Sequence, residues 1–209
     1  MSEIDEKLTP QIYLITPGTF DLAAFNKQLS AILDTHDIAC VRLALSSTDE
    51  RDIASAADQL RETCHARDVA IVIESHFRLV DPHGLDGVHL PDSARQVRDV
   101  REALGKDAIV GTYCGASRHA GMTAGEIGAD YISFGPVVET ALGSGKLAPF
   151  DLFEWWSETV EVPVVAEGNV TLEAATMLAP VIDFFALGDE IWGTDDPSST
   201  LGEYIKRIS

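Results

Sequence analysis

The sequence predicts an α/β fold, specifically a single-domain (β/α)8 TIM barrel, and three observations support this. Short runs rich in β-branched residues recur about eight times, and amphipathic stretches separate them. Such alternation predicts parallel strands, because two neighbouring parallel strands are joined by a crossover connection that is usually a helix. The length of 209 residues is close to the lower limit of about 200 for this barrel. No Pro/Gly-rich linker divides the chain, so we expect a barrel over 10–209 after a flexible tail over 1–9.

Each expected strand ends in a small or polar residue or shortly before one. The strands are expected at 12–16, 38–45, 69–74, 87–90, 108–111, 131–135, 162–167 and 184–188. In this fold the carboxyl ends of the strands carry the chemistry. Residues at those ends are therefore the candidates for function.

Helices are expected between the strands. Residues 20–36 and 49–67 place apolar side chains near helical spacing, with Ser47 or Thr48 as the cap of the second helix. Gly105 is expected to end the helix that follows the fourth strand.

Three more helices are expected later in the chain. One covers 150–160, one covers 171–181 with Thr171 or Asn169 as its cap, and the last begins at Asp196 and Pro197.

The charge balance is strongly acidic, with 34 acidic and 15 basic residues, a net charge of -19 and a pI near 4.4. Such a field repels nucleic acid and anionic membranes, so neither is an expected partner. No apolar run is long enough to span a membrane, and the charged first residues lack the apolar core of a secretory signal. We therefore expect a cytoplasmic protein. The three cysteines show no zinc or redox spacing and are expected to be reduced thiols.

Four phrases of the sequence resemble those of thiamine-phosphate synthases and the related thiazole tautomerases, in order and approximate spacing. They are YLIT at 13–16, LDGVHL at 85–90, GADYISFGP at 128–136 and PVVA at 163–166. The resemblance implies a barrel that joins a pyrimidine pyrophosphate to a thiazole phosphate and releases pyrophosphate. It would then be a transferase. The tautomerase branch would instead be an isomerase that moves the thiazole double bond.

The resemblance also implies site residues at the ends of the second to fourth strands. In the Gln-x-Arg-x-Lys segment of the synthases, this chain has Arg42 at the Gln position, Ala44 at the Arg position and Ser46 at the Lys position. Where the family has an Asn-Asp pair, this chain has Glu74-Ser75, so its acid lies one residue earlier. In a regular strand that shift directs the side chain to the opposite face of the sheet, but at a strand end the alternation can relax and let Glu74 reach the mouth. Asp92 lies two residues before the expected metal ligand. Magnesium is expected only if Arg42, Glu74 and Asp92 rebuild a pyrophosphate site, and no other cofactor is expected.

Later loops provide further candidates for substrate binding. Thr140 is retained from the family's Thr-x-Thr-Lys segment, and Lys146 follows in a Gly-Ser-Gly-Lys turn, either as a phosphate ligand or as an exposed side chain. Glu167 and Asn169 lie in the glycine-rich turn after the seventh strand, and Asp189 follows the eighth. Carboxylates at a phosphate cradle oppose a dianion, because like charges repel strongly once water is excluded.

Proton transfer would fall to histidine, which titrates near neutrality. The resemblance implies a proton shuttle beyond the fifth strand, where His119 is the candidate catalytic residue. His76, just after the third strand, is a second candidate, with Glu74 as its acidic neighbour. Tyr113, at the end of the fifth strand, is a candidate ligand contact. His89, inside a strand, is expected to be a packed core residue.

Three functions remain open from the sequence. The first is an enzyme of thiamine or thiazole metabolism with an altered phosphate site. The second is a diverged paralogue that binds or transforms an unphosphorylated, cationic heterocycle, with Glu74, Glu167 and Asp189 as counter-charges. The third is a non-catalytic partner subunit. The expected ligand is a small heterocycle with or without phosphate, and self-association into a homo-oligomer stays open.

Overall fold

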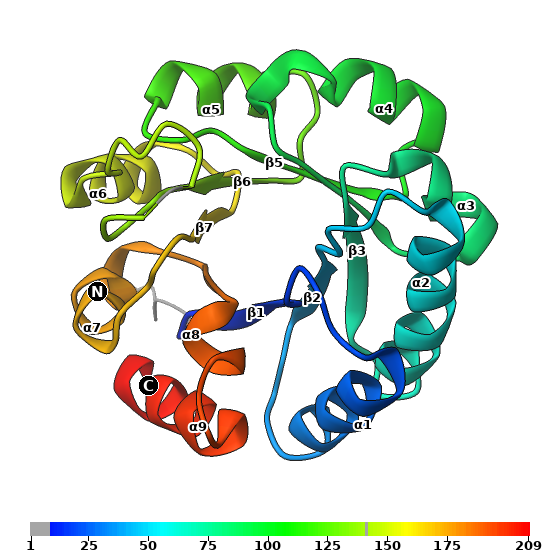
Figure 1. Cartoon of the computed structure of the whole chain (residues 1–209). Helices are drawn as coiled ribbons and strands as arrows, with labels where there is room; N and C mark the ends of the chain where they lie inside the picture. The colour runs from blue at the N-terminus through cyan, green and yellow to red at the C-terminus, as the bar shows by residue number, and fades with distance from the viewer. Residues whose placement is uncertain (1–8, 141) are drawn as a thin grey trace, which may run out of the picture.

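The computed structural model describes residues 9–140 and 142–209 and has a closed barrel of eight parallel strands in this part of the chain (Figure 1). The strands pair in sequence order, and β1 closes the barrel against β8. They are β1 (Gln11–Ile15), β2 (Cys40–Leu43), β3 (Ala70–Glu74), β4 (Gly87–Leu90), β5 (Ile109–Tyr113), β6 (Tyr131–Phe134), β7 (Val164–Ala166) and β8 (Phe184–Leu187). The expected (β/α)8 barrel is confirmed. The tail expected over 1–9 lies, apart from Thr9, outside the described residues.

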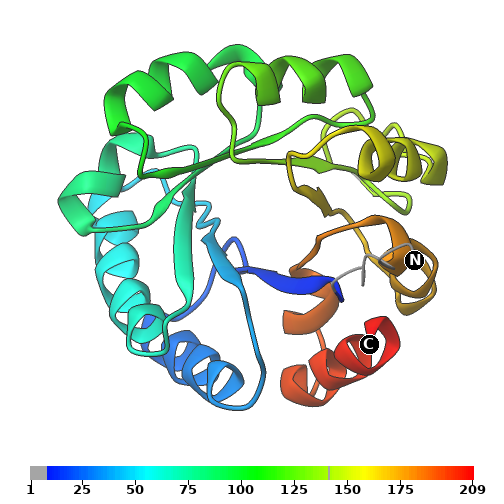
Figure 2. The ribbon, with the colours of Figure 1, turned by 180° about the vertical axis from the view of Figure 1, so that it is seen from behind.

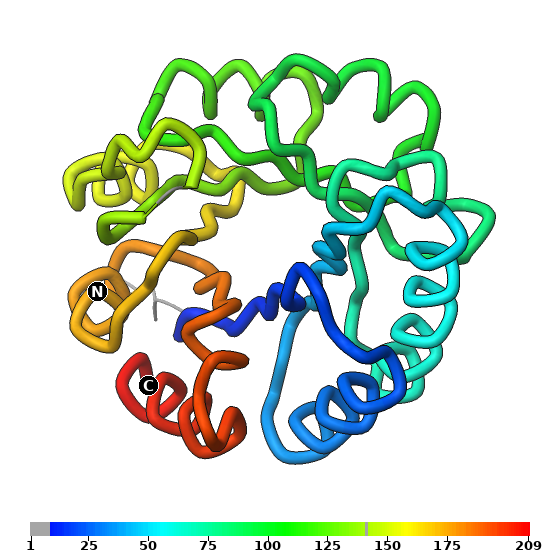
Figure 3. Tube along the Cα trace, in the orientation of Figure 1, coloured from blue at the N-terminus to red at the C-terminus, as the bar shows by residue number. Residues whose placement is uncertain are grey.

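Helices form a ring around the strands, as Figures 1 and 2 show from opposite sides. They are α1 (Leu22–Leu33), α2 (Glu50–His65), α3 (Val80–His83), α4 (Val97–Leu104), α5 (Arg118–Glu126), α6 (Phe150–Thr159), α7 (Leu172–Leu178), α8 (Asp189–Trp192) and α9 (Pro197–Ile208). Figure 3 shows that the chain makes one circuit of the barrel, so that its first strand (blue) meets its last (orange).

Several helix ends match the sequence expectations and one does not. Thr171 caps α7 through Ala174, Asp196 caps α9 through Ser199, and Gly105 ends α4. The cap of α2 is Asp49, so the expectation of Ser47 or Thr48 is wrong. The Ser47 hydroxyl instead accepts from the Asp49 amide at 3.1 Å, one step before the helix.

The second strand is shorter than its apolar run suggests. The run 38–45 predicts a longer strand, but β2 ends at Leu43. The amide of the next residue, Ala44, donates to the Thr16 hydroxyl at 3.0 Å rather than to the strand ladder. The chain therefore leaves the sheet at the mouth of the barrel, beside the end of β1.

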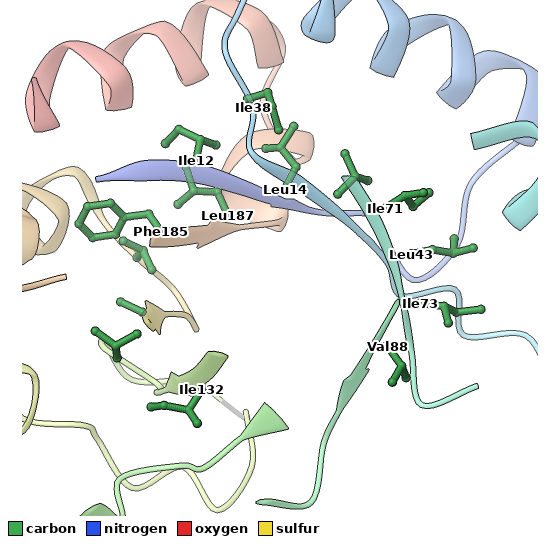
Figure 4. Close-up of a cluster of buried hydrophobic side chains, with 14 of the residues drawn as sticks. Ile12, Leu14, Ile38, Leu43, Ile71, Ile73, Val88, Ile132, Phe185 and Leu187 are labelled. Carbon is green, nitrogen blue, oxygen red and sulfur yellow. The ribbon is translucent and has the colours of Figure 1, made fainter. Parts of the chain in front are cut away.

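Alternation along the strands divides the core into two. Outward side chains such as Leu14, Ile73 and Val88 pack against the helices, and Figure 4 shows this outer cluster. A second cluster fills the barrel itself, and its buried members are Tyr13, Val72, Tyr131, Val165 and Ala186. The inner cluster is small and leaves the upper interior to polar residues.

Three aspartates fasten neighbouring strands at the opposite, amino-terminal end. Each directly precedes an even-numbered strand, and its carboxylate accepts the first free amide of the strand before it. The bonds run from Ile71 to Asp86 at 2.7 Å, from Val110 to Asp130 at 2.7 Å and from Val164 to Asp183 at 2.8 Å. A charged acceptor strengthens these bonds, so the aspartates help to set the strand register.

No helix among the described residues has both the length and the apolar character needed to cross a membrane.

Candidate functional site

A layer of polar side chains caps the inner cluster at the carboxyl end of the barrel. Each lies two residues beyond an inward-facing position, on the same strand or, for Glu167, directly after its end, so the pleat directs it to the interior. These side chains are Arg42, Glu74, His89, Ser133 and Glu167. Glu74 thus faces inward, which answers the question that its displaced position raised. The layer combines positive, negative and neutral groups within one enclosed space.

Arg42 and Glu167 form an ion pair across the barrel. Arg42 Nη2 donates to Glu167 Oε2 at 2.7 Å, and the side chains are only 5% and 2% exposed. The other oxygen of Glu167 accepts from the Ser133 hydroxyl at 3.1 Å. β1 and β8 lie between β2 and β7 in the barrel, and Ala186 of β8 lines the same cavity as the two partners. Glu74 adds a second, looser pair, with 3.5 Å between its Oε2 and Arg42 Nε.

The guanidinium of Arg42 still has donor capacity. Its Nη1 is buried and has no hydrogen-bond partner among the described residues. Burial alone lowers the pKa of Arg42, but the negative charges of Glu167 and Glu74 outweigh it and raise the pKa overall. Arg42 is therefore a permanent cation. An unpaired donor of this kind is costly without an acceptor, which a ligand can supply.

Beneath the ion pair, three side chains form a hydrogen-bonded chain. The hydroxyls of Tyr13 and Tyr131 lie 2.8 Å apart, and the Tyr131 hydroxyl lies 2.9 Å from His89 Nδ1. Burial lowers the pKa of His89, and the positive charge of Arg42 lowers it further, so the imidazole is neutral. The expectation that His89 is a packed core residue is confirmed by its 1% exposure. This chain forms a rigid floor below the mouth.

A cavity of about 570 Å³ opens above this floor, at the carboxyl ends of β1, β2, β7 and β8. Its lining includes five residues expected from the sequence, which are Arg42, Thr140, Glu167, Asn169 and Asp189. Asn169 adopts a left-handed backbone conformation with φ of 54°, and its side chain donates to the Glu139 carbonyl at 3.2 Å. The structure thus places the candidates from β2 and from the loops after β6, β7 and β8 around the same cavity.

Several other expected residues do not line this cavity. Lys146 and His119 are exposed, on the loop after β6 and on α5. Tyr113 is buried, and its hydroxyl donates to the Gly135 carbonyl at 2.6 Å. Ser46 lines a different hollow between α1 and α2. His76 is half-buried, and its Nδ1 donates to the Glu74 carbonyl at 2.8 Å, which leaves Nε2 with its lone pair when the ring is neutral.

The described residues provide no cluster of several ligands for magnesium. Within 9–140 and 142–209, no three His, Cys, Asp or Glu side chains cluster as metal ligands. Asp92 accepts from the Gln96 amide at 3.0 Å with one oxygen, and its other oxygen is buried without a partner. Glu74 is instead engaged with Arg42. Asp92, which forms no ion pair among the described residues, is thus the expected carboxylate left for a magnesium ion, whose other ligands would have to be substrate phosphates and water.

Two functional positions did not stand out as site residues in the sequence. Ser133 orients Glu167, and its signal was its position two residues after the inward Tyr131. Glu190 lines the cavity and accepts from two backbone amides, those of Gly188 and Val170. The sequence places Glu190 beside Asp189 without showing which of the two turns inward.

Known proteins share this chain's sequence pattern and fold. The model of the thiamine monophosphate synthase family matches residues 12–191. A thiamine-phosphate synthase of Rhodospirillum centenum is 41% identical over 184 residues, which cover 87% of this chain and 89% of the relative. One of Erythrobacter litoralis is 33% identical over 199 residues and 92% of each chain.

The solved structure of a thiamine phosphate pyrophosphorylase from Pyrococcus furiosus has a TM-score of 0.84 to this chain at 19% identity, over 96% of each. That likeness shows the shared barrel. The sequence matches also show the family, because the family model covers residues 12–191 and a relative is 41% identical over 87% of this chain. The chain therefore belongs to the thiamine monophosphate synthase family.

Proposed function

We propose that this chain acts in thiamine metabolism by binding and transforming a small heterocycle at the barrel mouth, and that it does so without the pyrophosphate chemistry of a synthase. The observation that carries the proposal is the buried Arg42–Glu167 pair, because Arg42 lines the cavity and its Nη1 and Nε make no hydrogen bond among the described residues. Free guanidinium N–H groups of this kind suit a hydroxyl, carbonyl or ring-nitrogen acceptor on a compact ligand.

The surrounding charges favour a neutral or cationic ring. Glu74 is more exposed than its partners, with 39% of its side chain accessible, and Asp189 lies on the cavity rim. A carboxylate close to a bound cationic ring stabilises the positive charge, and Glu74 is also able to accept a proton from it. His76 is held by its bond to the Glu74 carbonyl, and neither His76 nor the Glu74 side chain lines the cavity, so a ligand must extend past Arg42 to reach them. With that placement, Glu74 and His76 are the residues we expect to carry an isomerase-type or related proton transfer.

Synthase turnover is the second candidate, because the relatives that match this chain are named thiamine-phosphate synthases. A leaving pyrophosphate needs cations or a metal to take up its charge. Among the described residues that line the cavity, the one cation is Arg42, which is already paired with a buried carboxylate, and Lys146 is exposed on its loop. The geometry therefore gives this reaction less support than it gives heterocycle binding.

A binding panel separates the candidates. Thermal unfolding is followed with free thiamine, thiamine phosphate, thiazole phosphate and pyrophosphate, each with and without magnesium, since a ligand that binds the folded state raises its melting temperature. Selective stabilisation by free thiamine supports our proposal. Stabilisation by thiazole phosphate and by pyrophosphate with magnesium, together with product formation, establishes the synthase instead. No response to any ligand contradicts both and favours a non-catalytic partner subunit.

A conservative variant tests the role of Arg42. Arg42→Lys keeps the positive charge beside Glu167 but removes the second guanidinium nitrogen, so the fold is retained while the free donor is lost. We expect ligand affinity to fall about tenfold, as for the loss of one charged hydrogen bond. Arg51→Lys is the matched control, because the Arg51 side chain is 91% exposed. Equal affinities of the two variants would place the ligand elsewhere.

Two further expectations accompany the proposal. Membership of the thiamine monophosphate synthase family supports a cytoplasmic location, which cell fractionation tests. Self-association into a homo-oligomer is tested by light scattering at micromolar concentration.

A further inference from the structure

The hydrogen-bonded chain inside the barrel ends at an imidazole nitrogen that has no partner. The Tyr13 and Tyr131 hydroxyls lie 2.8 Å apart, and the Tyr131 hydroxyl lies 2.9 Å from His89 Nδ1. The other ring nitrogen of His89, Nε2, makes no hydrogen bond with the described residues. What His89 can do at the mouth therefore depends on which of its two nitrogens carries the proton.

A glycine on the strand between them lets the Tyr131 ring reach His89. Gly111 lies on β5, in register with His89 of β4 and with Tyr131 of β6. A Cβ at Gly111 would lie 1.9 Å from the Tyr131 ring, so the ring fills the space of the missing side chain. The two rings are stacked, with centroids 5.7 Å apart and an angle of 23° between their planes. This packing holds the imidazole in one orientation.

The two hydroxyl protons give the chain a direction. Tyr13 is 2% exposed, and among the described residues its hydroxyl has no acceptor other than Tyr131. A buried hydroxyl proton without an acceptor is costly, so Tyr13 donates to Tyr131 and Tyr131 donates to His89 Nδ1. Burial raises the pKa of both tyrosines, which keep their protons, and lowers the pKa of His89, whose ring then carries one proton. That proton lies on Nε2.

The Nε2 atom of His89 faces the part of the mouth next to Glu74. The two residues are register partners on β4 and β3, and both side chains point inward. The fully buried polar side-chain atoms without a partner in the described part of the chain are Arg42 Nε, Arg42 Nη1 and Asp92 Oδ1. His89 Nε2 is not one of them, so it retains contact with accessible space. A ligand that extends past Arg42 towards Glu74, whose side chain is 39% accessible, meets this nitrogen.

We propose that the two tyrosines fix His89 as the tautomer protonated at Nε2, and that this N–H determines specificity by selecting ligands with a hydrogen-bond acceptor at the inner end of the mouth. A ring nitrogen or a carbonyl oxygen fits such a donor, whereas a ligand N–H at the same place would oppose it. His89 is then a donor, which leaves the role of base to Glu74 or His76. The statement about the ligand rests on the proposed function, but the statement about the tautomer does not.

The tautomer is tested in the ligand-free, ¹⁵N-labelled chain. Two-bond ¹H–¹⁵N correlation spectra distinguish a protonated from an unprotonated ring nitrogen, and the His89 signals are those absent from His89→Gln. We expect a proton on Nε2 and none on Nδ1. Tyr131→Phe removes the donor to Nδ1 and should give a mixture of both tautomers, whereas Tyr13→Phe leaves that donor in place and should retain the Nε2–H form. A proton on Nδ1 in the unmodified chain, or a pure Nε2–H form in Tyr131→Phe, overturns the proposal and leaves the proposed function intact.

Binding is tested with free thiamine, whose pyrimidine nitrogens and hydroxyl are acceptors. Calorimetric titration compares the unmodified chain with His89→Gln, whose amide can donate from a similar position, and with His89→Met, which has no donor. We expect affinity within about threefold for His89→Gln and about tenfold weaker for His89→Met, as for the loss of one hydrogen bond. His83→Met is the matched control and should leave affinity unchanged, because His83 lies on α3 in the outer ring and bonds Asp58.

The outcomes separate this inference from the proposed function. Equal affinities of His89→Met and the unmodified chain overturn the inference alone, and absence of thiamine binding by the unmodified chain contradicts both. Urea unfolding checks that each variant folds. If His89→Met does not fold, Tyr131→Phe replaces it, and an equal mixture of tautomers should then weaken binding about twofold, since half of the molecules present the donor. Unchanged affinity in spite of mixed tautomers overturns the inference.

Discussion

Neutralisation of Glu167 is the sharpest test of the ion pair at the mouth. Glu167→Gln keeps the size of the side chain and removes its charge, which leaves Arg42 buried with only the looser contact to Glu74 at 3.5 Å. At 4 Å two charges attract by about 4 kcal/mol at an effective dielectric constant of 20, and loss of one member of a buried pair typically costs about 3–5 kcal/mol. Since Glu74 still compensates in part, we expect the free energy of unfolding to fall by about 3 kcal/mol.

The assay is urea unfolding of the unmodified chain, Glu167→Gln, Arg42→Met and the double variant. Folded domains are stable by about 5–15 kcal/mol, so a loss of this size is measurable without complete unfolding. The double variant removes both charges and leaves no buried charge of this pair uncompensated. Its stability loss is therefore expected to be smaller than the sum of the single losses by about 2 kcal/mol, which is the coupling free energy.

Additive single effects would refute this reasoning. If the double variant loses the sum of the two single losses within about 0.5 kcal/mol, Arg42 and Glu167 do not interact in the folded protein. An unchanged slope of the unfolding free energy against urea concentration is the control that all four proteins unfold in the same manner.

Three further changes test other parts of the barrel. The pKa of His89 is lowered in the folded state, so below about pH 6.5 the unfolded chain binds a proton that the folded chain does not. As the pH decreases in this range, the free energy of unfolding falls by up to about 1.4 kcal/mol per pH unit. Urea unfolding of His89→Gln at several pH values should show a weaker dependence of this free energy on pH. Gly111→Ala places a Cβ 1.9 Å from the Tyr131 ring, and we expect thermal unfolding to show a loss of roughly 1–3 kcal/mol, whereas no loss would mean that the ring moves freely. Asp183→Ala leaves the Val164 amide without its acceptor, and chemical unfolding should show a loss of roughly 1–3 kcal/mol; unchanged stability would argue against the strand-fastening role.

Much of the architecture followed from local pattern. The spacing of β-branched runs predicted all eight strands, and β4 has the expected bounds of Gly87–Leu90. The errors lie at ends, where tertiary contacts decide. β2 ends at Leu43 because Thr16, the residue after β1, accepts the amide of the next residue. Asp49 caps α2 in place of the equally suitable Ser47 or Thr48.

The candidate site was predicted in part, for the same reason. Position on a strand end was enough to bring Arg42, Glu167 and Asp189 to one cavity, since parallel strands share their carboxyl edge. The prediction that Lys146 and His119 belong to the site was less successful, because the path of the chain beyond a strand end depends on packing that the residue type does not reveal. These two side chains are exposed and do not line the cavity.

The sequence by itself therefore determined the barrel, the family and the strand ends that carry polar residues, because periodicity and motif are local properties of a chain. Only the tertiary structure decided which of these residues are partners. Arg42 and Glu167 are 125 positions apart and meet through the closure of the barrel, and the Glu190 carboxylate binds amides of two separate segments. Such contacts depend on distances across a closed sheet, which no spacing along the chain specifies.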